Sequence, residues 1–140
     1  MNYLVDTNVV SELRKGRRCD PGVAAWFAGV SSREIYLSAL TVGEIRKGIE
    51  GIRRRDTPSA EILETWLQEI VAAHSDRILA VDQDIAEQWG RLNVPDPLPV
   101  IDSLLAATAQ IHGLTLVTRN LDDVGRTGVK CLNPFRTPSS

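Results

Sequence analysis

The sequence predicts an α/β protein with a central, mostly parallel sheet that is covered by helices on both faces. Stretches of helical periodicity alternate along the chain with short apolar segments at 3–5, 34–38, 77–81 and 114–118. Such short, almost entirely apolar strands are typical of parallel sheets that are buried on both sides. The result is the three-layer α/β/α arrangement, in which the carboxyl ends of the strands form the usual ligand site.

Length and composition favour one domain with its own core. The chain has 140 residues, of which 43% are hydrophobic and 24% are charged, as in ordinary globular proteins. We expect the domain to cover residues 1–136 and a short tail to cover 137–140. A last strand is expected around 129–131.

Capping residues predict where the helices begin. Asp6 and the two residues after it can cap a helix that runs to about Leu13, and Asp20 followed by proline starts the second helix. Thr41 with Glu44 three residues later matches a capping box. Asp82 caps a later helix, and Asp102 stands at the head of another.

Several classes of protein are excluded by what the sequence lacks. No apolar run is long enough for a membrane span, and the first residues contain no secretory signal, so we expect a cytoplasmic protein. Cys19 and Cys131 are far apart and histidines are scarce, which disfavours a disulfide framework or a zinc site. No glycine-rich phosphate-binding motif is present. A net charge of −2 argues against wholesale attraction to nucleic acid, although local basic clusters exist.

The most informative pattern is a set of acidic and amide residues at strand ends and helix starts. Asp6 closes the first strand, Glu44 and Asp102 open helices, and Asn120 and Asp123 follow the strand at 114–118. Each of them alone is well explained as a helix cap or a turn former. Together they would meet at one edge of a parallel sheet, where their mutual repulsion requires a cation. Oxygen ligands favour Mg²⁺ or Mn²⁺, and such an ion suits phosphodiester hydrolysis.

Four segments, in this order, resemble the motifs of PIN-domain proteins. They are Leu4–Leu13, Leu37–Ile45, Pro99–Ala109 and Val117–Asn120 with Asp123. More narrowly, the chain resembles the VapC-type ribonuclease toxins of bacterial toxin–antitoxin pairs, over essentially its whole length.

The resemblance implies a fold, an activity and a set of site residues. The fold is the PIN-like α/β/α sandwich, and the activity is that of a Mg²⁺- or Mn²⁺-dependent endoribonuclease. Asp6, Glu44 and Asp102 match the three acids of the family's metal site, Asn120 matches its fourth position, and Asp123 matches the next acid. Two departures stand out: Asn120 carries no charge, so Asp123 would serve as the remaining ligand, and Val124 replaces the usual aromatic residue. The resemblance also implies RNA as substrate, a small VapB-like antitoxin whose tail masks the active-site groove, and a homodimer.

Basic and aromatic residues extend these expectations. Candidates for contact with the RNA backbone are Arg14, Lys15, Arg46 and Lys47, which are equally compatible with solvated helix faces. Candidates for partner surfaces are Trp26, Phe27, Trp66 and Leu67. His112, before Gly113, is read as a structural residue at a helix C-terminus.

Three alternatives remain open at this point. The chain could be a PIN-like module that binds RNA or protein without cleavage, or a PIN nuclease outside a toxin–antitoxin pair. A phosphoacceptor or phosphatase fold with a phosphorylated Asp6 is disfavoured, because Thr7 and Asn8 offer no second aspartate on the same loop.

Overall fold

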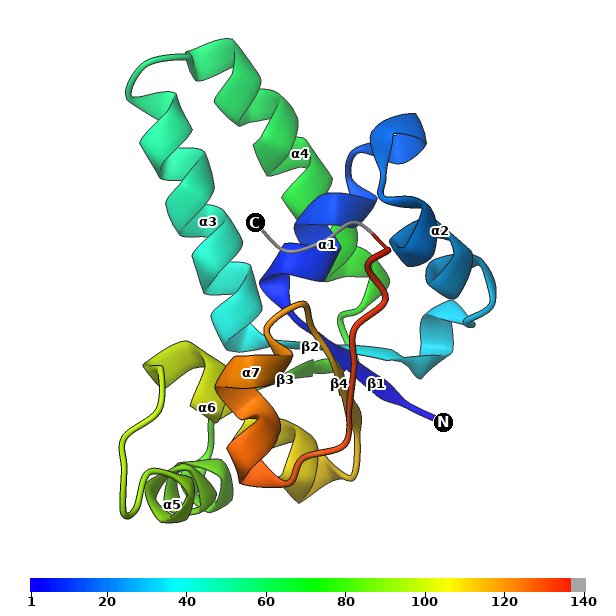
Figure 1. The fold of residues 1–140 in the computed structure, drawn as a ribbon. Helices are drawn as coiled ribbons and strands as arrows, with labels where there is room; N and C mark the ends of the chain where they lie inside the picture. Colours follow the sequence, from blue (N-terminus) through cyan, green and yellow to red (C-terminus); the bar gives the residue numbers. More distant parts are fainter. Residues whose placement is uncertain (137–140) are drawn as a thin grey trace.

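The computed structural model describes residues 1–136, and the predicted tail at 137–140 lies outside them. Its centre is a sheet of five parallel strands in the order β3-β2-β1-β4-β5 (Figure 1). The strands are β1 (Tyr3–Val5), β2 (Ile35–Ser38), β3 (Ile78–Leu79), β4 (Thr115–Val117) and β5 (Cys131–Leu132). The predicted parallel sheet is therefore confirmed, and all of its strand pairs are parallel.

The strands are joined by helices of very different lengths. They are α1 (Thr7–Leu13), α2 (Pro21–Ala28), α3 (Ala39–Arg53), α4 (Thr57–Ala73), α5 (Gln83–Leu92), α6 (Val100–His112) and α7 (Leu121–Val124). Short 3₁₀ turns cover Gly16–Arg18, Ser32–Glu34 and Gly125–Thr127. Within the described residues, no helix combines the length and the apolar character needed to cross a membrane.

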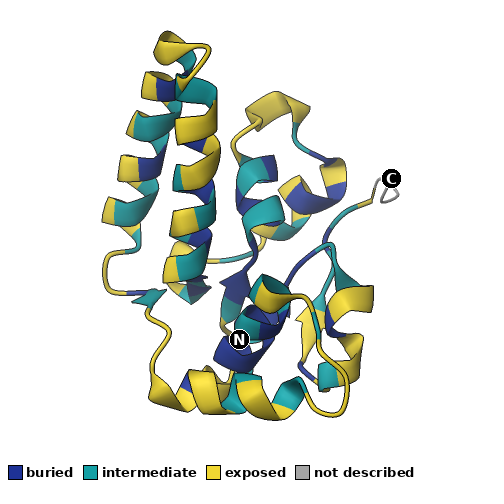
Figure 2. Ribbon diagram, turned by 90° about the vertical axis from the view of Figure 1, so that its left-hand side faces the viewer, coloured by how far each residue is buried: buried dark blue, intermediate teal, exposed yellow. Residues whose placement is uncertain are grey.

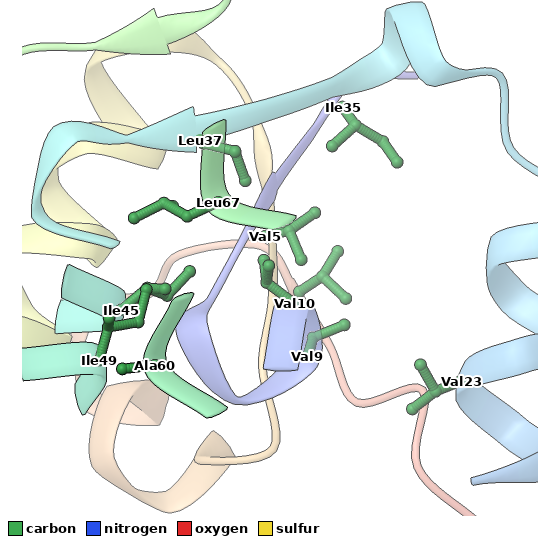
Figure 3. Close-up of a cluster of buried hydrophobic side chains, with 11 residues drawn as sticks. Val5, Val9, Val10, Val23, Ile35, Leu37, Ile45, Ile49, Ala60 and Leu67 are labelled. Atoms are coloured by element: carbon green, nitrogen blue, oxygen red, sulfur yellow. The ribbon is translucent and has the colours of Figure 1, made fainter. Parts of the chain in front are cut away.

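One face of the sheet packs against α1–α4. Val5 and Leu37 point from the strands toward α4, where Leu67 is 2% exposed (Figure 3). Ile45 and Ile49 of α3 meet Ala60 of α4, so the two helices form a packed hairpin that rises from the sheet (Figure 1). Figure 2 shows exposed residues along the outer sides of this hairpin. Burial of these aliphatic side chains supplies the main stabilisation of this layer.

The other face packs against α6 and α7. Leu4, which alternates with Val5 along β1, lies with Leu116 of β4 against Leu105 and Ala109 of α6. Val124 is 1% exposed in the same cluster, so the residue that departs from the family pattern fills a core position. Helix α5 packs outside α6, where the Trp89 indole donates a 3.0 Å hydrogen bond to the Ser103 hydroxyl.

Most predicted helix caps are confirmed. Asp6, Asp20 and Asp82 each accept a hydrogen bond from a backbone N–H of the helix that follows them. His112 ends α6, and Gly113 adopts the left-handed conformation that a C-terminal glycine permits.

Three predictions of local structure are wrong. Helix α3 begins at Ala39 with Ser38 as its cap, so Thr41 lies inside the helix and forms no capping box with Glu44. The segment after β4 contains the short helix α7 rather than a simple turn. The last strand is Cys131–Leu132, displaced from the expected 129–131 because its pairing with Leu116 and Val117 sets its position.

The strand order creates a switch point between β1 and β4. From β1 the chain proceeds to β2 and β3 on one side, and β4 and β5 then fill the other side. In open parallel sheets, ligands bind outside the carboxyl ends of the strands at such a point. Asp6 directly follows β1, and the segment with Asn120 follows β4.

Candidate active site at the switch point

Asp6 is held at the end of β1 by three donors. One carboxylate oxygen, Oδ1, accepts a 2.6 Å hydrogen bond from the Thr7 backbone N–H. The other, Oδ2, accepts from the Thr118 hydroxyl at 2.7 Å and from the Asn8 amide at 3.3 Å. Burial raises the pKa of Asp6, and the Glu44 carboxylate raises it further, whereas the hydrogen bond from Thr118 lowers it. The carboxylate is therefore fixed in orientation and kept in an environment that disfavours its charge.

Glu44 reaches the same place from α3. The Thr7 hydroxyl donates a 2.5 Å hydrogen bond to Oε1 of Glu44, while the Thr7 backbone N–H bonds Asp6. Thr7 thus joins the two carboxylates. The predicted capping role of Glu44 is wrong. The structure nevertheless places Glu44 near Asp6, as the sequence predicts.

Asp102 lies in the first turn of α6 and completes the group. Burial and the nearby carboxylates of Asp6 and Asp123 raise its pKa to about 6, partly offset by a hydrogen bond from Asn120. A hydrogen bond with Asp123 raises it as well. These interactions place Asp102 between Asp6 on one side and α7 on the other.

Asn120 and Asp123 occupy the start of α7. The Asn120 backbone N–H donates a 3.0 Å hydrogen bond to the Thr118 hydroxyl, which itself donates to Asp6. Asp123 is exposed, and its interaction with Asp102 is carboxylate to carboxylate. All five predicted site residues therefore come together, four of them with a negative charge.

The donor set suits a hard cation, although its geometry is open. In residues 1–136, no three or more acidic, histidine or cysteine side chains close around a point as metal ligands do. Asp6, Glu44 and Asp102 are instead turned onto neighbouring hydroxyl and amide groups. Carboxylate and amide oxygens at one edge are the ligands that Mg²⁺ and Mn²⁺ prefer.

The four basic candidates differ in their surroundings. Lys15 forms an ion pair with Glu12 at 2.9 Å, and Arg46 pairs with Glu50 at 3.1 Å and Glu64 at 2.6 Å. The Arg14 guanidinium lies 6.0 Å from the centre of the Trp66 ring. Lys47 is exposed, and the ion pairs of α3 involve Arg46 and Arg53 rather than Lys47.

Two grooves lead away from Glu44. The first lies between α3 and the start of α6, has a volume of about 630 Å³, and is lined by Ala39, Leu40, Gly43, Glu44, Lys47, Gly48 and Ile101. The second runs between α1 and the α3–α4 hairpin, from Thr7 and Glu44 past Gly48 to Arg14 and Trp66. Glu44 is therefore open to ligands from two directions.

Sequence reasoning missed the residues that orient the carboxylates. By local pattern, Thr7 and Asn8 are helix-capping neighbours of Asp6, and Thr118 is the end of a strand. A threonine that ends a buried strand and is followed by polar residues is the signal that could have identified Thr118, which is 1% exposed.

Comparison with known proteins identifies the family of the chain. The PIN domain family pattern matches residues 3–128. The chain belongs to the PIN-domain family. It is 32% identical to the VapC ribonuclease Y4jK of Sinorhizobium fredii over 94% of its length and 96% of that protein. It is 29% identical to Toxin FitB of Neisseria gonorrhoeae over 94% and 97% of the two chains.

Solved structures share the fold of this PIN domain. The FitAcB crystal structure from Neisseria gonorrhoeae superposes with a TM-score of 0.87 at 28% identity, covering 96% of this chain and 99% of the other. A FitAB structure bound to a DNA fragment gives 0.85 at 26% identity, with 98% of both chains covered. The PIN-like α/β/α fold predicted from the sequence is confirmed.

Proposed function

We propose that this PIN domain is a Mg²⁺- or Mn²⁺-dependent endoribonuclease that acts as the toxin of a VapBC-type toxin–antitoxin pair. The observation that carries the proposal is the convergence of Asp6, Glu44, Asp102 and Asp123 at the switch point of the sheet. The relatives support the substrate class, because a full-length relative at 32% identity is named a VapC ribonuclease.

The cation would be held by Asp6 and Asp102, with Glu44 and Asp123 as further ligands and Asn120 as a neutral neighbour. Bound there, it supplies polarisation of a phosphoryl oxygen and a lowered pKa for a coordinated water. Thr118 and Thr7 hold the Asp6 and Glu44 carboxylates at this edge of the sheet. One of the carboxylates accepts the proton of the water that attacks the phosphodiester in line.

Among the basic candidates, Lys47 and Arg14 have the best access to RNA. Both line grooves that begin at Glu44. Lys15 and Arg46 are engaged by acidic neighbours, so a phosphate would have to compete with those ion pairs.

We further propose that a small VapB-like antitoxin covers the second groove and that the protein forms a homodimer in the cytoplasm. One solved structure of similar fold is of a toxin–antitoxin complex from Klebsiella pneumoniae, at 27% identity and a TM-score of 0.70. Phe27 is 42% exposed and, with Trp66 and Arg14, lines a largely apolar cavity of about 240 Å³ beside that groove. Trp26 packs edge-on against Tyr3, with ring centres 5.4 Å apart, and is half-buried. Leu67 lies in the core, so the prediction that it belongs to a partner surface is wrong.

The test of the enzyme proposal is cleavage of varied structured and single-stranded RNAs by the purified chain with Mn²⁺. We expect cleavage that EDTA stops and that Asp102→Asn abolishes. Asp122→Asn is the matched control, since Asp122 is an exposed acid of α7 beside Asp123 and has no assigned role. Binding of these RNAs without any cleavage would instead favour the non-catalytic module.

The toxin assignment needs a separate observation. A small open reading frame beside the gene, whose product binds the chain and inhibits its cleavage of RNA, is the expected finding. Cleavage without such an inhibitor would point to a PIN nuclease outside a toxin–antitoxin pair.

A further inference from the structure

The groove between α3 and α6 begins at the acidic group. It joins a carboxylate of the acidic group, Glu44, to an exposed cation, Lys47, one helical turn away. Its volume of about 630 Å³ lies in the range of about 300–1,000 Å³ that is typical of small-molecule sites. Ile101, the residue before Asp102, forms the opposite wall. The groove is therefore bordered by Glu44 and by the residue that precedes Asp102.

Lys47 is the basic side chain that lines this groove and is accessible to a ligand. The neighbouring arginines of α3, Arg46 and Arg53, are held by Glu50 and Glu64 on the hairpin side. In the part of the chain that the structure describes, Lys47 forms no such ion pair. An exposed ammonium beside an acidic site suits a phosphate group that must approach that site against repulsion.

Two glycines of α3 line the groove. Gly43 and Gly48 both line it, and a Cβ at either position would meet nothing within 4 Å. Packing of the protein therefore does not demand glycine there, although glycine costs a helix about 1 kcal/mol relative to alanine. Without side chains at Gly43 and Gly48, the surface of α3 is low at these two positions. An external group can lie directly on the helix backbone.

We infer that this groove binds one nucleotide of single-stranded RNA next to the scissile phosphate, with its phosphate on Lys47 and its base and ribose over Gly43 and Gly48. Leu40 and Ile101 contact the base through apolar surface, which every base can offer. This inference rests on the proposed ribonuclease function and adds the place where the substrate strand leaves the acidic site. Unpaired nucleotides fit such a site because their faces are free, whereas those of a duplex are stacked.

The test measures binding of a fluorescein-labelled single-stranded RNA to the full chain in an Asp102→Asn background, together with cleavage by the corresponding variants that keep Asp102. Gly43→Leu and Gly48→Leu each fill the groove with a side chain that the protein has room for. Gly51→Leu is the matched control, because Gly51 is an exposed glycine of the same helix with equally open space and does not line the groove. We expect both groove variants to bind RNA about tenfold more weakly than Gly51→Leu, with melting temperatures that match that of Gly51→Leu.

Two glycines are needed because each also borders another groove. Gly48 lines the groove toward Trp66, and Gly43 lines a shallow one between α3 and α4. A loss of binding in Gly48→Leu alone would place the RNA on the Trp66 side and overturn the inference. Lys47→Gln should lower the slope of log affinity against log salt by about 0.7, as expected for one lost phosphate contact.

The readouts separate this inference from the proposed function. If the chain cuts RNA and both groove variants match Gly51→Leu in cleavage and binding, the ribonuclease stands and the nucleotide site is wrong. If the wild type cuts no RNA, the enzyme proposal fails. The binding comparison then decides the nucleotide site by itself, and absence of RNA binding overturns it.

Discussion

The hydroxyl of Thr118 donates a 2.7 Å hydrogen bond to Oδ2 of Asp6 and so connects the ends of two neighbouring strands. The same hydroxyl accepts a hydrogen bond from the Asn120 backbone N–H at the start of α7. One buried side chain therefore positions both the central carboxylate and the segment that carries Asn120 and Asp123.

Replacing this hydroxyl should impair the site more than the fold. Thr118→Val keeps the shape of the side chain but leaves the buried Asp6 with one donor fewer, at a cost of about 1–3 kcal/mol in unfolding free energy. We expect RNA cleavage to fall at least about tenfold beyond what the loss of folded protein explains. Thr118→Ser should restore most of the activity. Equal cleavage by the valine and serine variants would remove Thr118 from a positioning role.

Removing the charge of Asp102 should abolish activity without destabilising the protein. The raised pKa of Asp102 means that its carboxylate is disfavoured by burial and by Asp6 and Asp123. Asp102→Asn removes that repulsion, so we expect an unchanged or higher melting temperature without metal, together with a loss of cleavage of at least about 100-fold. Thermal melts and cleavage assays on the same preparation check both parts. A strongly destabilised variant would contradict the first.

Metal affinity should depend on pH. A carboxyl whose pKa rises on folding from 3.8 to about 6 keeps its proton in the folded protein after the unfolded chain has lost it. Its contribution to stability is fully present below the unfolded pKa and is lost as the pH rises through about 6. Because a cation binds the ionised form, the apparent Mg²⁺ affinity should rise between about pH 5 and about pH 7.5. Calorimetric titration with Mg²⁺ measures this rise, which Asp102→Asn should flatten.

Exchanging the charge between Asn120 and Asp123 tests which of them serves as the fourth metal ligand. Asp123→Asn should weaken Mn²⁺ binding about tenfold or more, because Asn120 cannot replace the lost charge. Asn120→Asp should recover binding in that background. The assignment of Asp123 as a ligand is wrong if Asp123→Asn binds Mn²⁺ like the wild type in a calorimetric titration.

A stability prediction independent of the active site concerns Gly22 in α2. A Cβ there would lie 2.2 Å from the Pro134 carbonyl oxygen and 2.8 Å from the Arg136 backbone nitrogen. Gly22→Ala should therefore push the C-terminal segment off α2 and cost about 1–3 kcal/mol of unfolding free energy. Gly51→Ala, in open helix surface, should instead stabilise by about 0.5–1 kcal/mol. Urea unfolding of both variants provides the comparison.

The sheet and the acids were predictable from the sequence because both depend on local signals. Apolar runs specify buried parallel strands, and Asp6, Glu44 and Asp102 stand at element boundaries, where side chains gather at the sheet edge. The start of α3 was not predictable, because Ser38 and Thr41 are both good caps and only the end of β2 decides between them. The position of β5 follows from pairing with β4, a long-range contact. Likewise, the sequence does not show that Arg46 is ion-paired whereas Lys47, within the described residues, is not. The ion pair of Arg46 with Glu64 joins α3 to α4, and no local pattern relates the two residues.

The pairing of β1 with β4 also decides when the active site can exist during synthesis. Asp6, Glu44 and Asp102 leave the ribosome before Val117 and Thr118, which supply the carbonyl for the Asp6 backbone N–H and the hydroxyl for its carboxylate. A nascent chain that ends before β4 has the acids but not the strand that aligns them. The site can therefore assemble only after β4 has been synthesised.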